Sequence, residues 1–258
     1  MRNIFITAIA AMAFAGAAAA QTITGEVALD VAENAAGDYA VTPSFDLGVA
    51  AGDLATVSLG FVAEDGSAVT LDTWTVGTTV GGIGVAIGDD NGLFPGAEGE
   101  QTLAAPAMAE SVKLSFGDAA VAVGFTDWST DATDISNIQG AYTLGGVAGL
   151  VDVTAAVDYN MDTKNTVVGA GISGLQLGGI ATLGGVVTYD TDASAFGYEG
   201  VVGAYGVTAY VNGDDTDAFQ NVGGSYEYKL GGATLSAGAN YDVNASEFAP
   251  TAGISFAF

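Results

Sequence analysis

Hydrophobic and polar residues alternate along almost the whole chain after residue 20. In the segments 22–31, 151–160 and 233–242, apolar residues such as Leu29 fall on one face of an extended chain. Acidic and other polar residues such as Asp30 fall on the opposite face. Successive side chains of a β-strand point to opposite faces, so this period of two predicts strands with one dry and one wet face.

The breaks between these segments are of two kinds, which follow each other in turn. Eight are longer and acidic, and seven are short and glycine-rich. The acidic breaks are 33–38, 64–68, 89–108, 129–134, 160–165, 190–194, 212–218 and 242–247, and the glycine-rich breaks are 51–53, 81–82, 117–118, 145–146, 173–179, 205–206 and 231–232. Within the longest break, residues 102–105 are a candidate for a short helical turn.

Fifteen connections join sixteen strands. We expect the number of strands to be correct to within about two, because two of the breaks can be placed differently. An even number of antiparallel strands, with long loops at one end and short turns at the other, is typical of an outer-membrane barrel. We therefore predict an all-β fold, a transmembrane antiparallel β-barrel of about sixteen strands. Residues 21–258 form it as a single domain.

The first twenty residues have the pattern of a secretory signal peptide. Arg2 supplies a positive start, residues 4–14 an apolar stretch, and residues 18–20 a cleavage site of small residues. The alternative is a transmembrane helix, but the stretch is shorter than the about 20 apolar residues that a helix needs to cross a bilayer. We therefore expect an exported protein whose mature chain begins at Gln21.

The composition excludes several classes of protein. Lys and Arg number 4 against 30 Asp and Glu, which gives a formal net charge of −26, and both His and Cys are absent. Nucleic-acid binding needs basic residues to neutralise phosphates, and zinc sites or thiol chemistry need His or Cys. Because 50% of the residues are hydrophobic, the chain is not an acidic disordered one. A chain both apolar and acidic suits a protein that shows one face to lipid and another to water.

The end of the chain and the region 74–125 resemble the general-diffusion porins of Gram-negative bacteria, most closely those of alphaproteobacteria. Phe258 ends an alternating strand, as the outer-membrane assembly signature of that family does. Residues 76–88 resemble the family's strand–turn–strand before its third loop, and residues 89–108, with Phe94-Pro95-Gly96, stand where the inward-folded constriction loop lies. Glu110-Ser111-Val112-Lys113-Leu114 resembles the strand that follows.

The resemblance implies a sixteen-stranded barrel with an inward-folded third loop. It also implies a homotrimer in the outer membrane that passes small polar solutes and is inserted by the outer-membrane assembly machinery. One feature departs from the family, which usually sets a cluster of arginines on the wall opposite an acidic third loop. This chain has no arginine after Arg2, and Lys113 alone matches a basic wall position.

The third-loop carboxylates are the first candidate functional group. They are Asp89, Asp90, Glu98 and Glu100, with Glu110 at the loop's exit. Rings of Asp or Glu select for cations in channels, so these residues predict an acidic constriction. The alternative is a solvated external loop that never enters the lumen.

Charged residues on the polar faces of the strands form the second group, the pore wall. Its carboxylates are Glu26, Asp30, Asp46, Asp152, Asp158, Glu227 and Asp242, and its lysines are Lys113 and Lys229. A charge on the lipid face is costly, so we expect these side chains to point into water inside the barrel. The alternative is a merely wet wall in which no single residue matters and Lys229 pairs with Glu227.

Other chemistry has little support in the sequence. The acidic runs 131–134 and 214–217 are candidates for weak calcium binding, but no spacing matches a known calcium loop, and a solvated loop tip is the alternative. We expect no other cofactor, no metal site and no enzymatic activity, because no nucleophile, phosphate-binding or metal motif is present.

The predicted function is a water-filled, cation-preferring pore for ions and small polar solutes in the outer membrane. The expected partners are outer-membrane lipid, two further copies of the chain, the assembly machinery, small polar solutes and cations, but no nucleic acid. The alternative function is a non-conducting structural or adhesive barrel. A soluble secreted β protein is disfavoured, because no repeat of fixed period is visible.

Overall fold

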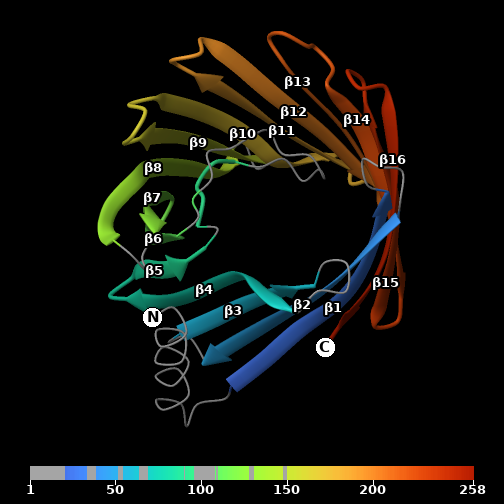
Figure 1. Cartoon of the computed structure of the whole chain (residues 1–258), viewed down its shortest axis with the longest axis horizontal. Helices are drawn as coiled ribbons and strands as arrows, with labels where there is room; N and C mark the ends of the chain where they lie inside the picture. The colour runs from blue at the N-terminus through green and yellow to red at the C-terminus, as the bar shows by residue number, and fades with distance from the viewer. Residues whose placement is uncertain are drawn as a thin grey trace.

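The computed structural model describes residues 21–33, 39–51, 55–63, 69–89, 91–95, 108, 110–127, 131–147 and 150–258. Its strands form one closed sheet in which each is antiparallel to its neighbours in sequence, and β1 closes the ring by pairing with β16 (Figure 1). None of these residues forms a helix long and apolar enough to cross a membrane.

The sixteen strands follow one another in chain order around the barrel. They are β1 Gln21–Glu33, β2 Tyr39–Ala51, β3 Ala55–Val62, β4 Thr70–Val80, β5 Ile83–Gly88, β6 Glu110–Phe116, β7 Ala119–Asp127, β8 Asp131–Val147, β9 Val151–Asn160, β10 Thr166–Leu177, β11 Ala181–Asp190, β12 Ala195–Ala204, β13 Val207–Asp214, β14 Asn221–Leu230, β15 Ala233–Asp242 and β16 Glu247–Ala257.

The predicted barrel of sixteen antiparallel strands is confirmed. The turn predicted at 145–146 is wrong, and the one predicted at 173–179 begins too early, since the turn itself starts at Gly178. The glycine-rich segments 145–146 and 173–179 were expected to end strands, but β8 continues to Val147 and β10 to Leu177. The strand pairing shifts register at both places, where Gly146 and Gly174 take positive φ angles of 60° and 71°. These glycines therefore mark bulges within strands, because a bulge places a residue in a conformation that glycine adopts at little cost.

Two acidic loops also begin or end at other residues than the sequence suggests. β8 begins at Asp131 inside the expected loop 129–134, and the loop expected at 212–218 lies between Asp214 and Asn221. The candidate signal peptide 1–20 and the candidate helical turn 102–105 lie outside the described residues.

The outer face of the barrel carries large apolar side chains on strand after strand. Leu29, Leu114, Val187, Val222 and Phe256 are all exposed there. A soluble protein seldom leaves so much apolar surface in contact with water. Apolar side chains on the outside are what the predicted transmembrane barrel requires, because its outer surface faces the hydrocarbon of the bilayer.

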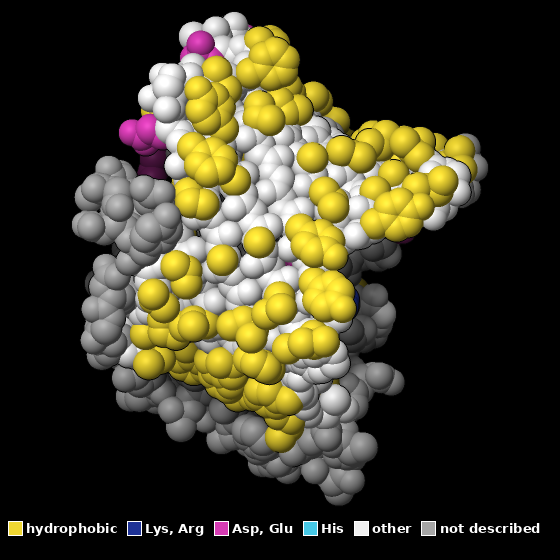
Figure 2. Space-filling model, turned by 90° about the vertical axis from the view of Figure 1, so that its right-hand side faces the viewer, with side chains coloured by type: hydrophobic (Ala, Val, Ile, Leu, Met, Phe, Trp, Pro, Cys, Tyr) yellow, Lys and Arg dark blue, Asp and Glu magenta, His cyan; other side chains and the backbone are white. Residues whose placement is uncertain are grey.

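Aromatic side chains stand near both ends of this outer face. Tyr159, Tyr189 and Phe248 lie where strands meet the longer loops, and Phe116 and Tyr205 lie beside the short turns. On the face of the molecule drawn in Figure 2, aromatic rings gather along two edges, and small side chains and backbone show between them. Two such girdles are typical of barrels that cross a membrane.

The last residue closes the barrel. The Gly25 amide donates to the Phe258 carbonyl at 3.0 Å, and the Phe258 amide donates to the Gly25 carbonyl at 2.9 Å. The Phe258 ring lies over Gly25, where a Cβ would stand 2.8 Å from the ring's Cε2 atom. The ring also stacks on Phe45, with centroids 6.3 Å apart. Phe258 therefore contributes two backbone hydrogen bonds and an aromatic contact to the seam between β1 and β16.

Deletion of Phe258 is expected to weaken this seam and to lower the yield of folded barrel. It removes both hydrogen bonds to Gly25 and the stacking on Phe45, a loss of about 2–3 kcal/mol from typical contributions. The measurement is the temperature at which the purified barrel loses its fast migration in SDS gels. Phe248→Ala, an exposed aromatic position on the same strand, is the matched control. Equal melting temperatures for the deletion and the native protein would contradict a role of Phe258 in closure.

Candidate pore lining and the root of the third loop

The inner face of the wall can be followed from Gln139, which accepts a hydrogen bond from a loop residue inside the barrel. Gln139 lies opposite Ala122 on one side and Asp158 on the other. Ala122 in turn lies opposite Lys113, so Lys113 faces inward. Each pairing partner shares its face of the sheet with the residue across from it, and the same face can be traced around the ring.

The traced register agrees with the predicted phase of the wall residues. Each predicted wall residue lies at an inward position, which gives the list Glu26, Asp30, Asp46, Lys113, Asp152, Asp158, Glu227, Lys229 and Asp242. Their individual functional roles remain predictions.

The wall residues are spread over the height of the barrel rather than gathered in one site. Glu26 and Asp46 are brought together, because they lie directly opposite each other on β1 and β2. Asp152 lies at the turn end of β9, where its Oδ1 accepts the Gly146 amide at 2.6 Å. Glu227 and Lys229, both described residues, are not joined by an ion pair.

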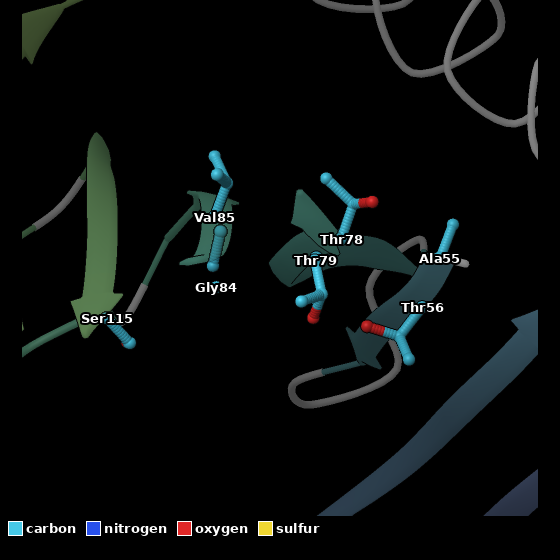
Figure 3. A pocket seen from close by; sticks show the side chains of 9 residues that line it. Ala55, Thr56, Thr78, Thr79, Gly84, Val85 and Ser115 are labelled. Carbon is cyan, nitrogen blue, oxygen red and sulfur yellow. The ribbon is translucent and has the colours of Figure 1, made fainter. Parts of the chain in front are cut away.

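Hydroxyl groups line a hollow on the inner wall near the short-turn end of β3–β6. Figure 3 shows Thr56, Thr79 and Ser115 on one side of the strands, and Ala55 and Thr78 on the other. A Cβ on Gly77 would stand 2.8 Å from the Thr56 Oγ1 atom, so the threonine lies flat over the neighbouring strand. The same arrangement joins Thr24 to Gly48, Thr182 to Gly203 and Thr251 to Gly238.

The third loop begins inside the ring of strands. Asn91 is buried, and its Nδ2 donates to the Gly88 carbonyl at 3.2 Å; the Ser111 hydroxyl donates to the same carbonyl, also at 3.2 Å. The Leu93 amide then donates to the Oε1 of Gln139 at 2.8 Å. In Figure 1 the coloured trace that follows β5, up to residue 95, runs within the ring of strands past β6–β9 toward β10.

Apolar side chains of the loop pack on small inward-facing residues of the wall. Leu93 and Met108 form a buried cluster with Ala122. Phe94 lies over Gly169, where a Cβ would stand 2.8 Å from two atoms of its ring. Pro95 lies over Gly171, where a Cβ would stand 3.0 Å from the proline Cγ.

Gly169 and Gly171 are therefore inward-facing glycines that leave room for side chains of the loop. The sequence reading missed the accompanying alanines. The available signal was a run of small residues at polar-phase positions on neighbouring strands, among them Ala122, Ala141 and Ala156.

Asp158 differs from the expectation of a carboxylate in open water. It faces inward as its phase predicts, but only 2% of it is exposed. It lies beside Asn137 and Gln139 on β8, and Asn137 donates to it at 2.7 Å. The alternation along β9 predicts the face on which Asp158 lies. It does not predict that a segment of the third loop packs against β8 and buries it.

Of the predicted third-loop carboxylates, Asp90, Glu98 and Glu100 lie outside the described residues. Asp89 and Glu110 stand at the loop's two ends and are half-buried. The Asp89 amide donates to the Trp74 carbonyl at 2.8 Å, and the Thr75 hydroxyl donates to the Asp89 carbonyl at 3.1 Å. The path of the loop between residues 95 and 108 is not described, so the inward fold of the loop as a whole stays a prediction.

One asparagine and three aspartates at the other long loops have a structural role in turns. The side-chain oxygens of Asn160, Asp190, Asp214 and Asp242 each accept two backbone amides from the residues two and three positions later. This side-chain capping is a common way to close a turn. Asp242 therefore closes a turn as well as facing inward. Asp214, in the candidate calcium run 214–217, also closes a turn. Calcium binding remains a prediction.

Solved structures with the same architecture are bacterial porins. A mutant of the Rh. blastica porin matches with a TM-score of 0.62 and 12% sequence identity, over 93% of this chain and 100% of that one. The anion-selective porin of Comamonas acidovorans matches with a TM-score of 0.60 and 15% identity, over 93% and 99% of the two chains. The chain has the fold of the bacterial porins.

A third structure with the porin fold is the outer membrane channel DcaP of Acinetobacter baumannii, which matches with a TM-score of 0.59 and 10% identity, over 92% of this chain and 97% of that one. No protein-family model matches the sequence. No curated protein matches it either.

Substitution Gly169→Ala is expected to loosen the root of the third loop. The added methyl would overlap the Phe94 ring, and overpacking of this kind typically costs about 1–3 kcal/mol. The measurement is the rate of amide hydrogen exchange at Leu93 in the folded barrel, which we expect to rise. Gly140→Ala is the control, because a Cβ there meets only a Val157 methyl at 3.8 Å. Equal exchange rates at Leu93 for the two variants would contradict the packing role of Gly169.

Proposed function

We propose that the chain forms a water-filled pore in the outer membrane of a Gram-negative bacterium, through which ions and small polar solutes diffuse passively. The observation that carries this proposal is the closed barrel of sixteen strands, apolar outside and lined by carboxylates, amides and hydroxyls inside. Barrels of about sixteen strands leave an aqueous channel, whereas barrels of about eight are filled by their side chains.

The charge of the inner wall supports a preference for cations. Seven of the predicted wall residues at inward positions are acidic and two, Lys113 and Lys229, are basic. The carboxylates are Glu26, Asp30, Asp46, Asp152, Asp158, Glu227 and Asp242, of which Asp158 is buried. A lumen lined by one sign of charge concentrates ions of the other sign. The porin of Comamonas acidovorans has the same fold and is described as anion-selective, so the fold does not set the sign. The side chains of the wall must do so.

Glu26 and Asp46 are the wall residues from which we expect the largest contribution. They lie directly opposite each other on β1 and β2, and the Cβ atoms of such a pair are about 4.5–5.5 Å apart. Two like charges at this distance repel each other and destabilise the sheet. A cation passing along the wall relieves that repulsion, and Asp30, also inward on β1, adds a third carboxylate nearby.

Assembly as a homotrimer belongs to the same proposal. Small outward-facing residues support it by forming a continuous row across four strands, with Ala209 opposite Gly224, Gly224 opposite Ala239, and Ala239 opposite Pro250. Such a row lets the backbone of a second copy approach closely. The outer-membrane assembly machinery is the further partner that the terminal Phe258 suggests.

The test is the reversal potential of the purified protein in a planar bilayer that separates two KCl concentrations. We expect a potential of the sign for cation preference, larger in dilute salt because screening is then weaker. The double variant Glu26→Gln, Asp46→Asn is expected to lower the ratio of potassium to chloride permeability about twofold at about 0.1 M, where the Debye length is about 10 Å. Lys113→Gln is expected to raise it slightly.

Asp162→Asn is the matched control, since it removes one carboxylate from an exposed loop outside the barrel. Glu98→Gln with Glu100→Gln tests the third loop in the same assay, and a lowered ratio there would indicate that the loop lines the narrowest section. Anion preference of the native pore would overturn the charge argument. Absence of conductance would favour the alternative function, a non-conducting structural or adhesive barrel.

A further inference from the structure

Four groups connect the third loop to the barrel wall through side-chain hydrogen bonds. Asp158 on β9 lies directly opposite Gln139 on β8, so that the Gln139 side chain is within reach of the Asp158 carboxylate. Asn137, two residues before Gln139 on the same face, donates from Nδ2 to the Asp158 Oδ1 at 2.7 Å. The Oε1 of Gln139 accepts the Leu93 amide at 2.8 Å. Gln139 is 0% exposed and Asn137 is 3% exposed, so water does not compete for these bonds.

The chemistry of these groups fixes their orientation. An ionised carboxylate only accepts hydrogen bonds, whereas a glutamine amide has one end that donates and one that accepts. Because Asp158 takes the NH₂ end of Gln139, the oxygen of Gln139 is left to face the loop. A backbone amide of the loop can then bond to it. If position 158 offered a donor instead, Gln139 would turn its oxygen toward that donor and present its NH₂ group to the Leu93 N–H.

We propose that Asp158 is a positioning residue that holds the root of the third loop on the inner wall by orienting Gln139 toward Leu93. It acts through Gln139 and not as a charge in the water path, since it is almost completely buried. The consequence for conduction rests on the proposed pore function: a loop root fixed to β8–β10 leaves the opposite wall, with Glu26 and Asp46, beside the open lumen.

The packing around the hydrogen bond makes the orientation of Gln139 matter for more than one residue. Leu93 precedes Phe94 and Pro95, which pack on Gly169 and Gly171 of β10. Leu93 itself packs in the buried cluster of the loop root. A loop released at the Leu93 amide therefore loses the anchor on which both sets of apolar contacts depend.

The test is a cycle of isosteric variants. Asp158→Asn removes the obligate acceptor without changing the shape of the side chain. The double variant Asp158→Asn, Gln139→Glu moves the carboxylate to position 139, where it accepts two hydrogen bonds. The amide introduced at position 158 donates one of them, and the Leu93 N–H donates the other. Each of these two buried donors again has an acceptor, and the net charge equals that of the native protein.

The measurement is amide hydrogen exchange at Leu93 in the full barrel in detergent. We expect Asp158→Asn to speed exchange about tenfold, the change that corresponds to loss of one hydrogen bond of about 1.4 kcal/mol. We expect the double variant to return exchange to near the native rate. Asp152→Asn is the control, because it removes an exposed carboxylate from the same face of the same strand and should leave Leu93 unchanged.

Native exchange at Leu93 in Asp158→Asn would overturn the proposal, and so would a double variant that stays fast while the barrel remains folded. If Asp158→Asn does not fold, Gln139→Met decides, because it removes the acceptor of the Leu93 amide and leaves Asp158 in place. Slow exchange in Gln139→Met would overturn the proposal, and fast exchange would support it. Hydrogen exchange at Leu93 does not depend on conduction. A native barrel that fails to conduct would therefore contradict the proposed pore function without affecting the conclusion about Asp158.

Discussion

The pairing of the first strand with the last is the interaction on which the rest of the structure depends. An open sheet has two edges of unpaired amides and carbonyls, and a bilayer offers no water to satisfy them. The pairing of β1 with β16, extended to the Gly25–Phe258 pair, removes both edges. Closure also creates the difference between inside and outside, because only in a ring does the alternation of side chains separate a lipid-facing surface from a lumen.

Once the ring is closed, a residue's position in the sequence decides its surroundings with little further information. The alternation in segments such as 22–31 therefore predicts both the strand and the face of Glu26 and Asp30, and the register agrees with it. Loop length supplies most of the remaining topology. Connections of four or more residues all follow odd-numbered strands, and those of two or three follow even-numbered ones, except for the three-residue connection between β7 and β8. The prediction of turns from glycine failed where glycine forms a bulge within a strand instead of a turn between strands. Gly146 and Gly174 form bulges, and in the sequence they cannot be distinguished from turn glycines.

The interior was harder to predict because it depends on contacts between segments far apart in the sequence. Nothing near Asp158 indicates that a loop beginning about seventy residues earlier packs over β8, because period-two patterning describes faces and not what covers them. The same holds for Gly169 and Gly171, which are small because Phe94 and Pro95 need the space. The opposing carboxylates Glu26 and Asp46 are visible in the sequence as acidic residues of the correct phase. Their opposition is a matter of register, which alternation alone does not give.

The flat threonines of the wall bear on the electrical behaviour of the barrel. Where a threonine lies over the glycine of the next strand, as Thr56 does over Gly77, the surface that borders the lumen is nearly the backbone itself. Backbone positions are held by the hydrogen-bond lattice, whereas long side chains change rotamer within nanoseconds. In the proposed pore, a stretch of wall bounded in this way is held in place by the strands and not by side-chain rotamers. Along this stretch, the current through the proposed pore should carry little of the fluctuation that changes of side-chain rotamer impose.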